Sequence, residues 1–378
     1  MRKHRLMTPG PSPVPEETLL ALAEPMFHHR TKEFEAILRD VLADLKYVFA
    51  TQNDVLILTS SGTGAMEAAV VNTVARGEKV IVLASGRFGE RWAEISKAFG
   101  IEPVVVAVGP GQSVTPAQLD DALKKNPDTV AVFATLCETS TGAGHDLEAM
   151  GKIVARTPAI LAVDGISGAG AMECRTDAWG IDILVTGSQK ALMLPPGLAF
   201  LTMSSKAWAR VEAVKPQAFY FDLKKMRKKI TVPDTLFTPA HTLIKALGVS
   251  LRKIREEGIE QVWSRHRRLA AACRAGVRAL GLELFAANPA DAVTTVTVPA
   301  GLDVTRLLAR LVERFGLKLV GGQDELKGRI FRIAHMGYMD ELDIIGVISA
   351  LELVLAELGW KVESGRAVTA AQQIVASG

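Results

Sequence analysis

The stretch VLILTSSGTGAMEAAVVNTVARG, at residues 55–77, decides the fold. It opens with a short apolar run, which is typical of a strand that is covered on both faces. A turn of small residues, TSSGTG at 59–64, comes next. The remaining stretch predicts a helix over residues 65–76, and Gly77 is suited to end it. The predicted order is therefore a buried strand, a glycine-rich turn and a helix.

The same alternation recurs through the first half of the chain. Six further apolar runs of strand length lie at residues 80–83, 104–108, 130–134, 160–163, 183–185 and 198–202. Helical patterns lie between them at residues 90–99, 115–125 and 147–155. Because strands that alternate with helices usually pair in parallel, the pattern predicts an α/β fold with a mainly parallel, doubly wound sheet.

The second half of the chain has a different pattern. A basic run, KKMRKK at 224–229, is typical of a solvated loop or helix face. Two long helical stretches and a β–α–β–α order follow at residues 241–258, 259–280 and 293–358. We therefore expect an N-terminal segment, a large domain and a smaller α+β domain at residues 1–15, 16–257 and 258–378. The last dozen residues are expected to form a frayed helix or to be disordered.

The composition argues against several classes of protein. Hydrophobic residues make up 48% of the 378 and charged residues 22%, as in globular proteins, so wholesale disorder is not expected. The net charge is +3 and the basic residues form no stripe, which argues against nucleic acid as a partner. The apolar runs are too short to span a membrane. The three cysteines form no CxxC pair, so neither disulfides nor a zinc site are expected. The N-terminus lacks the apolar stretch of a signal peptide, and we expect a soluble cytoplasmic protein.

Three polar features at predicted strand ends are candidates for a site. Residues 59–64 precede a helix, whose free N–H groups can bind a phosphate, although a capped turn is the simpler alternative. The turn is not a dinucleotide fingerprint, because Glu67 stands where the third glycine belongs. Asp164 ends the run LAVD, and Lys190 stands in GSQK after the run ILVT. Alone, they would be a helix cap and a surface lysine. Together, an anion cradle, a carboxylate and a lysine match the needs of pyridoxal phosphate.

Six motifs occur in an order that is much more specific than any one of them. They are TPGP (8–11), SGTGAMEA (61–68), ETSTG (138–142), VDGIS (163–167), GSQKA (187–191) and FRIAHMG (331–337). Over nearly its whole length the chain resembles the class V group of fold-type I aminotransferases, near the alanine–glyoxylate, serine–glyoxylate and serine–pyruvate enzymes. The resemblance implies a large domain with a parallel sheet, a smaller C-terminal domain, pyridoxal 5'-phosphate as cofactor and a homodimer. It implies ping-pong transfer of an amino group between alanine or serine and glyoxylate or pyruvate.

The resemblance also implies roles for residues that match the motifs. Lys190 would form the Schiff base with the cofactor and shuttle the proton, and Asp164 would pair with the ring nitrogen. The other residues expected to contact the cofactor are Ser61, Gly62 and Thr63 near the phosphate with Gln189, Phe88 and Ile166 on the two ring faces, and Thr139 at the phenolic oxygen. Thr238 would reach the phosphate that is bound in the partner subunit.

The substrate would be held on the opposite side of the pocket. Under the resemblance, Arg332 would grip the substrate carboxylate, because a guanidinium accommodates a carboxylate with two hydrogen bonds. Alone, Arg332 would more simply be a surface strand residue in an ion pair. Pro9 and Gly10 would line the substrate's side of the pocket, although TPGP is also a rigid turn. We identify no second arginine for a distal carboxylate, so small donors are expected.

Other residues are assigned more ordinary places. Thr235 aligns where a tyrosine often reaches the partner's phosphate, and it is too short for that contact. The histidines at 28, 29 and 335 are expected to be structural or to lie at the entrance. The N-terminal segment is expected to need the partner subunit to pack on.

Four alternatives remain open at this point. The first is an aspartate aminotransferase of the same family. The second is a cysteine desulfurase-like lyase, which carries histidines where this chain has Phe88 and Gln189, and whose reactive cysteine lies in a mobile loop. Cys137 and Cys174 lie in or after predicted strands instead. The third is a catalytically silent, aminotransferase-like binding subunit. A nicotinamide-dependent dehydrogenase is the weakest, because its glycine fingerprint is missing.

Overall fold

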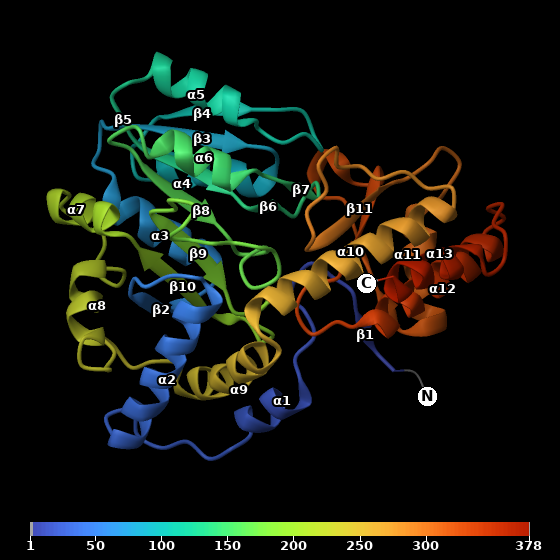
Figure 1. The fold of residues 1–378 in the computed structure, drawn as a ribbon, viewed down its shortest axis with the longest axis horizontal. Helices are drawn as coiled ribbons and strands as arrows, with labels where there is room; N and C mark the ends of the chain where they lie inside the picture. Colours follow the sequence, from blue (N-terminus) through green and yellow to red (C-terminus); the bar gives the residue numbers. More distant parts are fainter. Residues whose placement is uncertain (1–2, 378) are drawn as a thin grey trace.

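The computed structural model describes residues 3–377, and its largest element is a seven-stranded sheet (Figure 1). The strands, in spatial order, are β2 (Val55–Ser60), β10 (Gly197–Met203), β9 (Ile183–Gly187), β8 (Ile160–Asp164), β5 (Thr129–Thr135), β3 (Lys79–Ala84) and β4 (Pro103–Ala107). Only β10 is antiparallel to its neighbours. The predicted α/β fold with a mainly parallel sheet is therefore confirmed.

Helices cover both faces of this sheet. One face contacts α3 (Gly62–Thr73), α4 (Arg87–Ala98), α7 (Ser205–Ala213) and α8 (Leu223–Ile230). The other contacts α2 (Lys32–Val48), α5 (Pro116–Lys125), α6 (Leu147–Val154) and α9 (His241–Glu257), and α1 (Glu16–Leu22) packs on α9. In β5, Phe133 enters the core on the α3 side, whereas Val132 enters the core on the α2 side. A strand with two buried faces has few positions for polar residues, which explains the largely apolar runs.

A second group of elements surrounds a three-stranded antiparallel sheet. Its strands are β11 (Val293–Thr297), β14 (Ile330–Ala334) and β13 (Val320–Gly321). Its helices are α10 (Ile259–Ala279), α11 (Val304–Phe315), α12 (Glu341–Glu357) and α13 (Arg366–Ala376), with a short 3-10 turn, η1 (Asp324–Leu326). In Figure 1, α10 runs from the large sheet toward this group. We keep the division at 257/258 as a proposal, since Gly258 joins α9 to α10.

Two helices begin earlier than their sequence patterns indicate. The first, α3, starts at Gly62 instead of residue 65, so the end of the small-residue turn is its first turn. The second, α4, starts at Arg87 instead of residue 90, which places Phe88 in its first turn. The cause of the second shift is distant in sequence, because the buried carboxylate of Glu138 accepts the N–H groups of Phe88 and Gly89.

Both chain ends differ from their expectations. Residues Arg366–Ala376 form α13, whose Ala367 and Ala371 are fully buried. The N–H groups of its N-cap, Gly365, and of Ala367 donate to the carboxylate of Glu352. Of the two expectations for this end, disorder was wrong; a helix forms, and its first turns are packed instead of frayed. The N-terminal strand β1 (Arg5–Leu6) pairs in parallel with β12 (Leu317–Lys318), and Met7 joins the core of the second group. The N-terminal segment thus packs on its own chain and does not need a partner subunit to do so.

Three further observations bear on the sequence expectations. The basic run at 224–229 lies within α8, on the side of the sheet that carries α7. Within residues 3–377, no helix combines the length and apolarity needed to cross a membrane. Over the same residues, no group of three or more His, Cys, Asp or Glu side chains is arranged to hold a metal ion.

Candidate active site

The candidate site lies at one edge of the large sheet. Since β2 and β9 are both antiparallel to β10, they run in the same direction, and six of the seven strands end at this edge. Asp164 is the last residue of β8, Lys190 comes three residues after β9, and Gly62 starts α3 after β2. The three features that the sequence singled out are therefore brought together, at the edge where α/β folds bind ligands.

The N-terminal segment closes over Lys190. The Nζ of Lys190 donates a hydrogen bond to the carbonyl of Pro9 and lies 3.4 Å from Ser167 Oγ. The hydroxyl of Ser12 donates to the Lys190 carbonyl at 2.6 Å. Gly10 has a φ of +127°, and a Cβ there would lie 2.5 Å from Lys190 Nζ. Only glycine fits such a position, so the TPGP motif forms one wall of the lysine's pocket.

Burial shifts the pKa values of Asp164 and Lys190 in opposite directions. Burial raises the pKa of Asp164 to about 7, although the Ile166 N–H donates to its Oδ1 at 2.8 Å. Burial lowers the pKa of Lys190 to about 8, and the charge of Asp164 opposes that shift. Both groups consequently titrate close to neutral pH. A protonated ring nitrogen beside Asp164 would stabilise the carboxylate, so this pair fits pyridoxal phosphate.

The N-terminus of α3 has the features of an anion site. Its N-cap residue, Ser61, makes no side-chain capping hydrogen bond, so the helix end retains its attraction for an anion. Arg91 Nη1 donates to Thr63 Oγ1 at 3.3 Å, which adds a cation beside the first turn. Gln189 Oε1 is buried without a hydrogen-bond partner among the described residues. An amide with its O and N exchanged has the same shape and would direct N–H donors there, so these residues fit a phosphate.

Phe88 is held in place by a buried carboxylate. Glu138 Oε2 accepts hydrogen bonds from the N–H groups of Phe88 at 3.1 Å and Gly89 at 2.9 Å. The guanidinium of Arg91 lies 4.9 Å from the centroid of the Phe88 ring. A Cβ on Gly86, whose φ is +151°, would lie 2.9 Å from Glu138 Cδ. These contacts fix the start of α4, and Phe88 and Arg91 lie on the same side of the helix.

A chain of hydrogen bonds joins Lys190 to Arg332. Ser167 lies beside Lys190 and accepts from Thr139 Oγ1 at 2.6 Å, and the Thr139 carbonyl accepts from Arg332 Nη1 at 3.1 Å. Arg332 Nε and Nη2 both donate to the Gly321 carbonyl, at 3.2 and 3.0 Å. Arg332 is 5% exposed and has no ion pair within residues 3–377, unlike the surface ion pair considered above. A guanidinium has five N–H donors and three are used, so two remain for a carboxylate.

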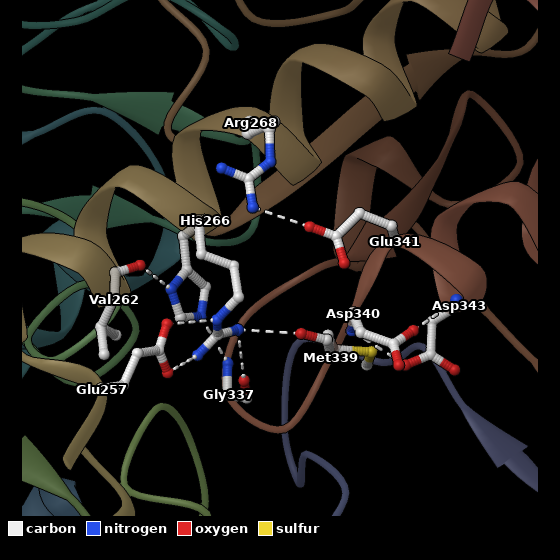
Figure 2. A network of polar contacts seen from close by, with 10 residues as sticks. Glu257, Val262, His266, Arg268, Gly337, Met339, Asp340, Glu341 and Asp343 are labelled. Carbon is white, nitrogen blue, oxygen red and sulfur yellow. Dashed lines mark hydrogen bonds and ion pairs between the residues drawn. The ribbon is translucent and has the colours of Figure 1, made fainter. Parts of the chain in front are cut away.

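The loop after β14 is fixed against this region by the network in Figure 2. His266 donates from Nδ1 to the Val262 carbonyl at 2.7 Å, and its Nε2 accepts the Gly337 N–H at 2.9 Å. Burial lowers the pKa of His266 to about 3, so this contact is insensitive to pH near neutrality. Arg265 binds Glu257 through two oxygens and donates to the Met339 carbonyl at 2.8 Å. The network ties α9 and α10 to the loop that follows Arg332's strand.

Three predicted residues lie outside the contacts described so far. Ile166 follows β8 and packs against the first residue of α3, where a Cβ on Gly62 would be 2.5 Å from its Cδ1. Thr238 is exposed, and it lines a pocket with Thr59 and Thr235 instead of contacting Lys190 of its own chain. His335 is buried, with Nε2 at 2.9 Å from Thr294 Oγ1, as expected of a structural histidine.

Three residues of the site were not predicted. Arg91 could have been found from its position three residues after Phe88, because residues i and i+3 share a helix face. Ser167 and Glu138 stand inside the VDGIS and ETSTG motifs, but only the structure assigns their hydrogen bonds.

Comparison with known proteins identifies the family. The model of the family described as "Aminotransferase class-V" matches residues 11–327. The chain belongs to the class V aminotransferases. It is accordingly an enzyme of fold type I with pyridoxal phosphate as cofactor and aminotransferase activity.

Individual relatives carry different names. The chain is 36% identical to an L-aspartate–glyoxylate aminotransferase from Paracoccus denitrificans, over 97% of this chain and 95% of that one. A protein named soluble hydrogenase, small subunit, from Synechococcus sp. (strain PCC 6716) is 41% identical over 99% of both chains. The solved structure of pyridoxamine–pyruvate aminotransferase from Mesorhizobium loti matches with a TM-score of 0.94 and 28% identity over 100% of both chains. The printed names of these three similar proteins differ in activity and in substrate.

The pKa of Lys190 predicts how the apo-protein takes up its cofactor. Only the neutral amine attacks an aldehyde, so the rate of covalent incorporation of pyridoxal phosphate should rise with pH and level off above about 8. Asp164→Asn should move the midpoint to lower pH, because the carboxylate raises the pKa of the lysine. Exposed Asp121→Asn is the control. Stopped-flow absorbance measures the rate, and a midpoint near 10.5 in wild type would contradict the prediction.

Proposed function

We propose that the enzyme transfers an amino group from a small L-amino acid, alanine or serine, to glyoxylate or pyruvate. The observation that carries the proposal is the hydrogen-bonded connection from Lys190 through Ser167 and Thr139 to Arg332. It links a lysine of lowered pKa to a guanidinium with two unused donors. Pyridoxal phosphate, when bound, supplies an electron sink that stabilises the negative charge left by loss of the α-proton.

The proposed roles follow from the contacts of each side chain. Lys190 Nζ takes the α-proton and returns it at the neighbouring carbon, because a pKa of about 8 allows both steps near neutral pH. Asp164 would keep the ring nitrogen of the cofactor protonated. The first turn of α3, Thr63 and Arg91 would bind the phosphate, and Gln189 would contribute its amide. Phe88 and Ile166 would contact the ring, as the resemblance to the family implies.

The substrate's α-carboxylate is assigned to Arg332. Its two remaining N–H donors match the two oxygens of a carboxylate. The contacts to Gly321 and Thr139 keep the guanidinium plane in one orientation without neutralising its charge, since both acceptors are carbonyl groups. Pro9 and Gly10 form the wall on the substrate's side, where the carbonyl of Pro9 accepts a hydrogen bond from Lys190.

The alternatives are weighed by the same geometry. A desulfurase needs a reactive cysteine, but burial raises the pKa of the Cys137 thiol to about 12 and that of Cys174 likewise to about 12. A silent subunit is suggested by the hydrogenase-subunit names of two relatives, from Synechococcus and Anabaena cylindrica, whereas the intact lysine, carboxylate and candidate anion site favour catalysis. An aspartate donor, suggested by the Paracoccus relative, would need a second cation for its distal carboxylate.

We further propose a homodimer in the cytoplasm. The exposure of Thr238, which lines a pocket with Thr59 and Thr235, supports a role toward a second copy. Phe219 and Val232, in the same part of the chain, are also exposed, at 78% and 68%. Apolar side chains of this size gain by being covered. The cytoplasm is supported by the three free cysteines.

The central test of the function is a half-reaction. Adding alanine or serine to the cofactor-loaded enzyme should convert the bound cofactor from its aldehyde to its amine form, and adding glyoxylate or pyruvate should reverse the change. Borohydride reduction before the donor is added should attach the pyridoxyl group to Lys190, located by peptide mass mapping. Absence of any spectral change with every donor, or an adduct on Lys206, would refute the proposal.

Arg332→Lys should lower kcat/KM for alanine by about a hundredfold or more. The substitution retains the charge but loses the planar fork, and it removes the hydrogen bonds to Gly321 and Thr139. Exposed Arg329→Lys, one residue before β14, is the matched control and should leave kcat/KM unchanged. An amine without a carboxylate should react slowly with wild type and respond little to Arg332→Lys. Equal losses for alanine and that amine would mean that Arg332 only supports the fold.

Sedimentation should show a dimer in solution. Thr238→Ala, which leaves Lys190 of the same chain in place, should then weaken cofactor binding, measured by equilibrium dialysis. Mixing Thr238→Ala with Lys190→Ala subunits tests the sharing of sites: if Thr238 serves the partner's site, each mixed dimer has one site that lacks both groups and one wild-type site. A fully active monomer at low concentration would overturn the dimer proposal.

A further inference from the structure

An ion pair joins the first turn of α4 to η1. Arg87 Nη1 lies 2.7 Å from Asp324 Oδ2, although the residues are 237 positions apart. Arg87 is the first residue of α4, and Asp324 is the first residue of η1. The contact therefore connects the helix that carries Phe88 to the second group of elements, which carries Arg332.

Both members of this pair are connected to segments that bind Arg332. The N–H of Arg87 donates to Ser140 Oγ at 3.2 Å, next to Thr139, whose carbonyl binds Arg332 Nη1. Asp324 comes three residues after Gly321, whose carbonyl binds Arg332 Nε and Nη2. The two segments that hold the guanidinium of Arg332 thus each continue into one member of the ion pair.

The ion pair is exposed to solvent. The side chains of Arg87 and Asp324 are 45% and 63% exposed, so solvent screens their attraction and the pair adds little to stability. Asp324 has a φ of +48°, a left-handed conformation that aspartate tolerates better than most residues. A carboxylate on a ligand could compete with Asp324 for Arg87, but it would first meet the negative charge that is already there.

We propose that Asp324 determines donor selectivity by occupying Arg87. The inference rests on the proposed function and on Arg332 as the α-carboxylate site. A donor with a second carboxylate needs a free cation at some distance from Arg332, and Arg87 is the arginine whose backbone adjoins that site. Because Asp324 neutralises Arg87, dicarboxylic donors are disfavoured, whereas alanine and serine, with no second charge, are unaffected. This is exclusion by an unfavourable charge, a common source of specificity.

Removing the charge of Asp324 and removing the charge of Arg87 should change the aspartate-to-alanine ratio of kcat/KM in opposite directions. Asp324→Asn preserves size and tolerates the same backbone conformation, and it should raise kcat/KM for aspartate by about fivefold relative to alanine. Arg87→Gln leaves Asp324 uncompensated and should lower the aspartate-to-alanine ratio by a similar factor. The double variant should return the ratio to within about twofold of wild type. Exposed Glu325→Gln, the neighbouring acid, is the matched control and should change the ratio by less than about twofold.

Binding of inert acids to the cofactor-loaded enzyme tests the inference without catalysis. Calorimetry should show that Asp324→Asn tightens succinate binding relative to propanoate, in the same proportion as the kinetic ratio. An unchanged ratio in Asp324→Asn, or an equal change in Glu325→Gln, would overturn the inference. A wild type that prefers aspartate would overturn it as well. Failure of the proposed function would appear differently, as no spectral change with any donor, and the binding ratio would still decide the role of Asp324.

Discussion

The burial of the Lys190 amine at the edge of the sheet, near Asp164, is the constraint on which the site depends. Burial disfavours the charged forms of both groups, as the lowered pKa of the lysine and the raised pKa of the carboxyl indicate. A fold retains such groups only when their polar atoms are satisfied. The carbonyl of Pro9 and the hydroxyl of Ser167 satisfy the amine, so the N-terminal segment must close over it.

That closure explains why the smaller group of elements is docked where it is. Along the N-terminal segment, β1 pairs with β12 and Met7 lies in the second core before the chain reaches Lys190. Ser12 then binds the Lys190 carbonyl, and the loop at Gly337 comes so close that a Cβ there would lie 3.2 Å from the same carbonyl oxygen. The interactions of Arg265 and His266 hold this loop. The lysine's environment is thus assembled from three distant parts of the chain.

The sequence could predict those features that depend on local pattern. Continuous apolar runs predicted the strands because both faces of the sheet are covered, and strand ends then predicted that Asp164 and Lys190 would meet. Glu138 could not be assigned in this way, because its hydrogen-bond partners at Phe88 and Gly89 lie about fifty residues away in sequence. The packing of α13 could not be predicted either, because an Ala-rich composition does not indicate which distant residues the helix contacts. Its stability comes from the buried carboxylate of Glu352 and from packing on α10 and α12.

The three arginines near the site differ in the charge of their partners. Arg91 binds a hydroxyl and an aromatic face, and Arg332 binds two carbonyl groups, so each keeps its positive charge. Within residues 3–377 neither forms an ion pair. Arg87 is different, because its partner is a carboxylate. An arginine oriented by neutral acceptors is prepared for an anionic ligand, whereas one paired with an acid is electrostatically occupied. The sequence shows three equivalent guanidinium groups, and the charge of each partner separates two anion sites from one whose charge is already neutralised.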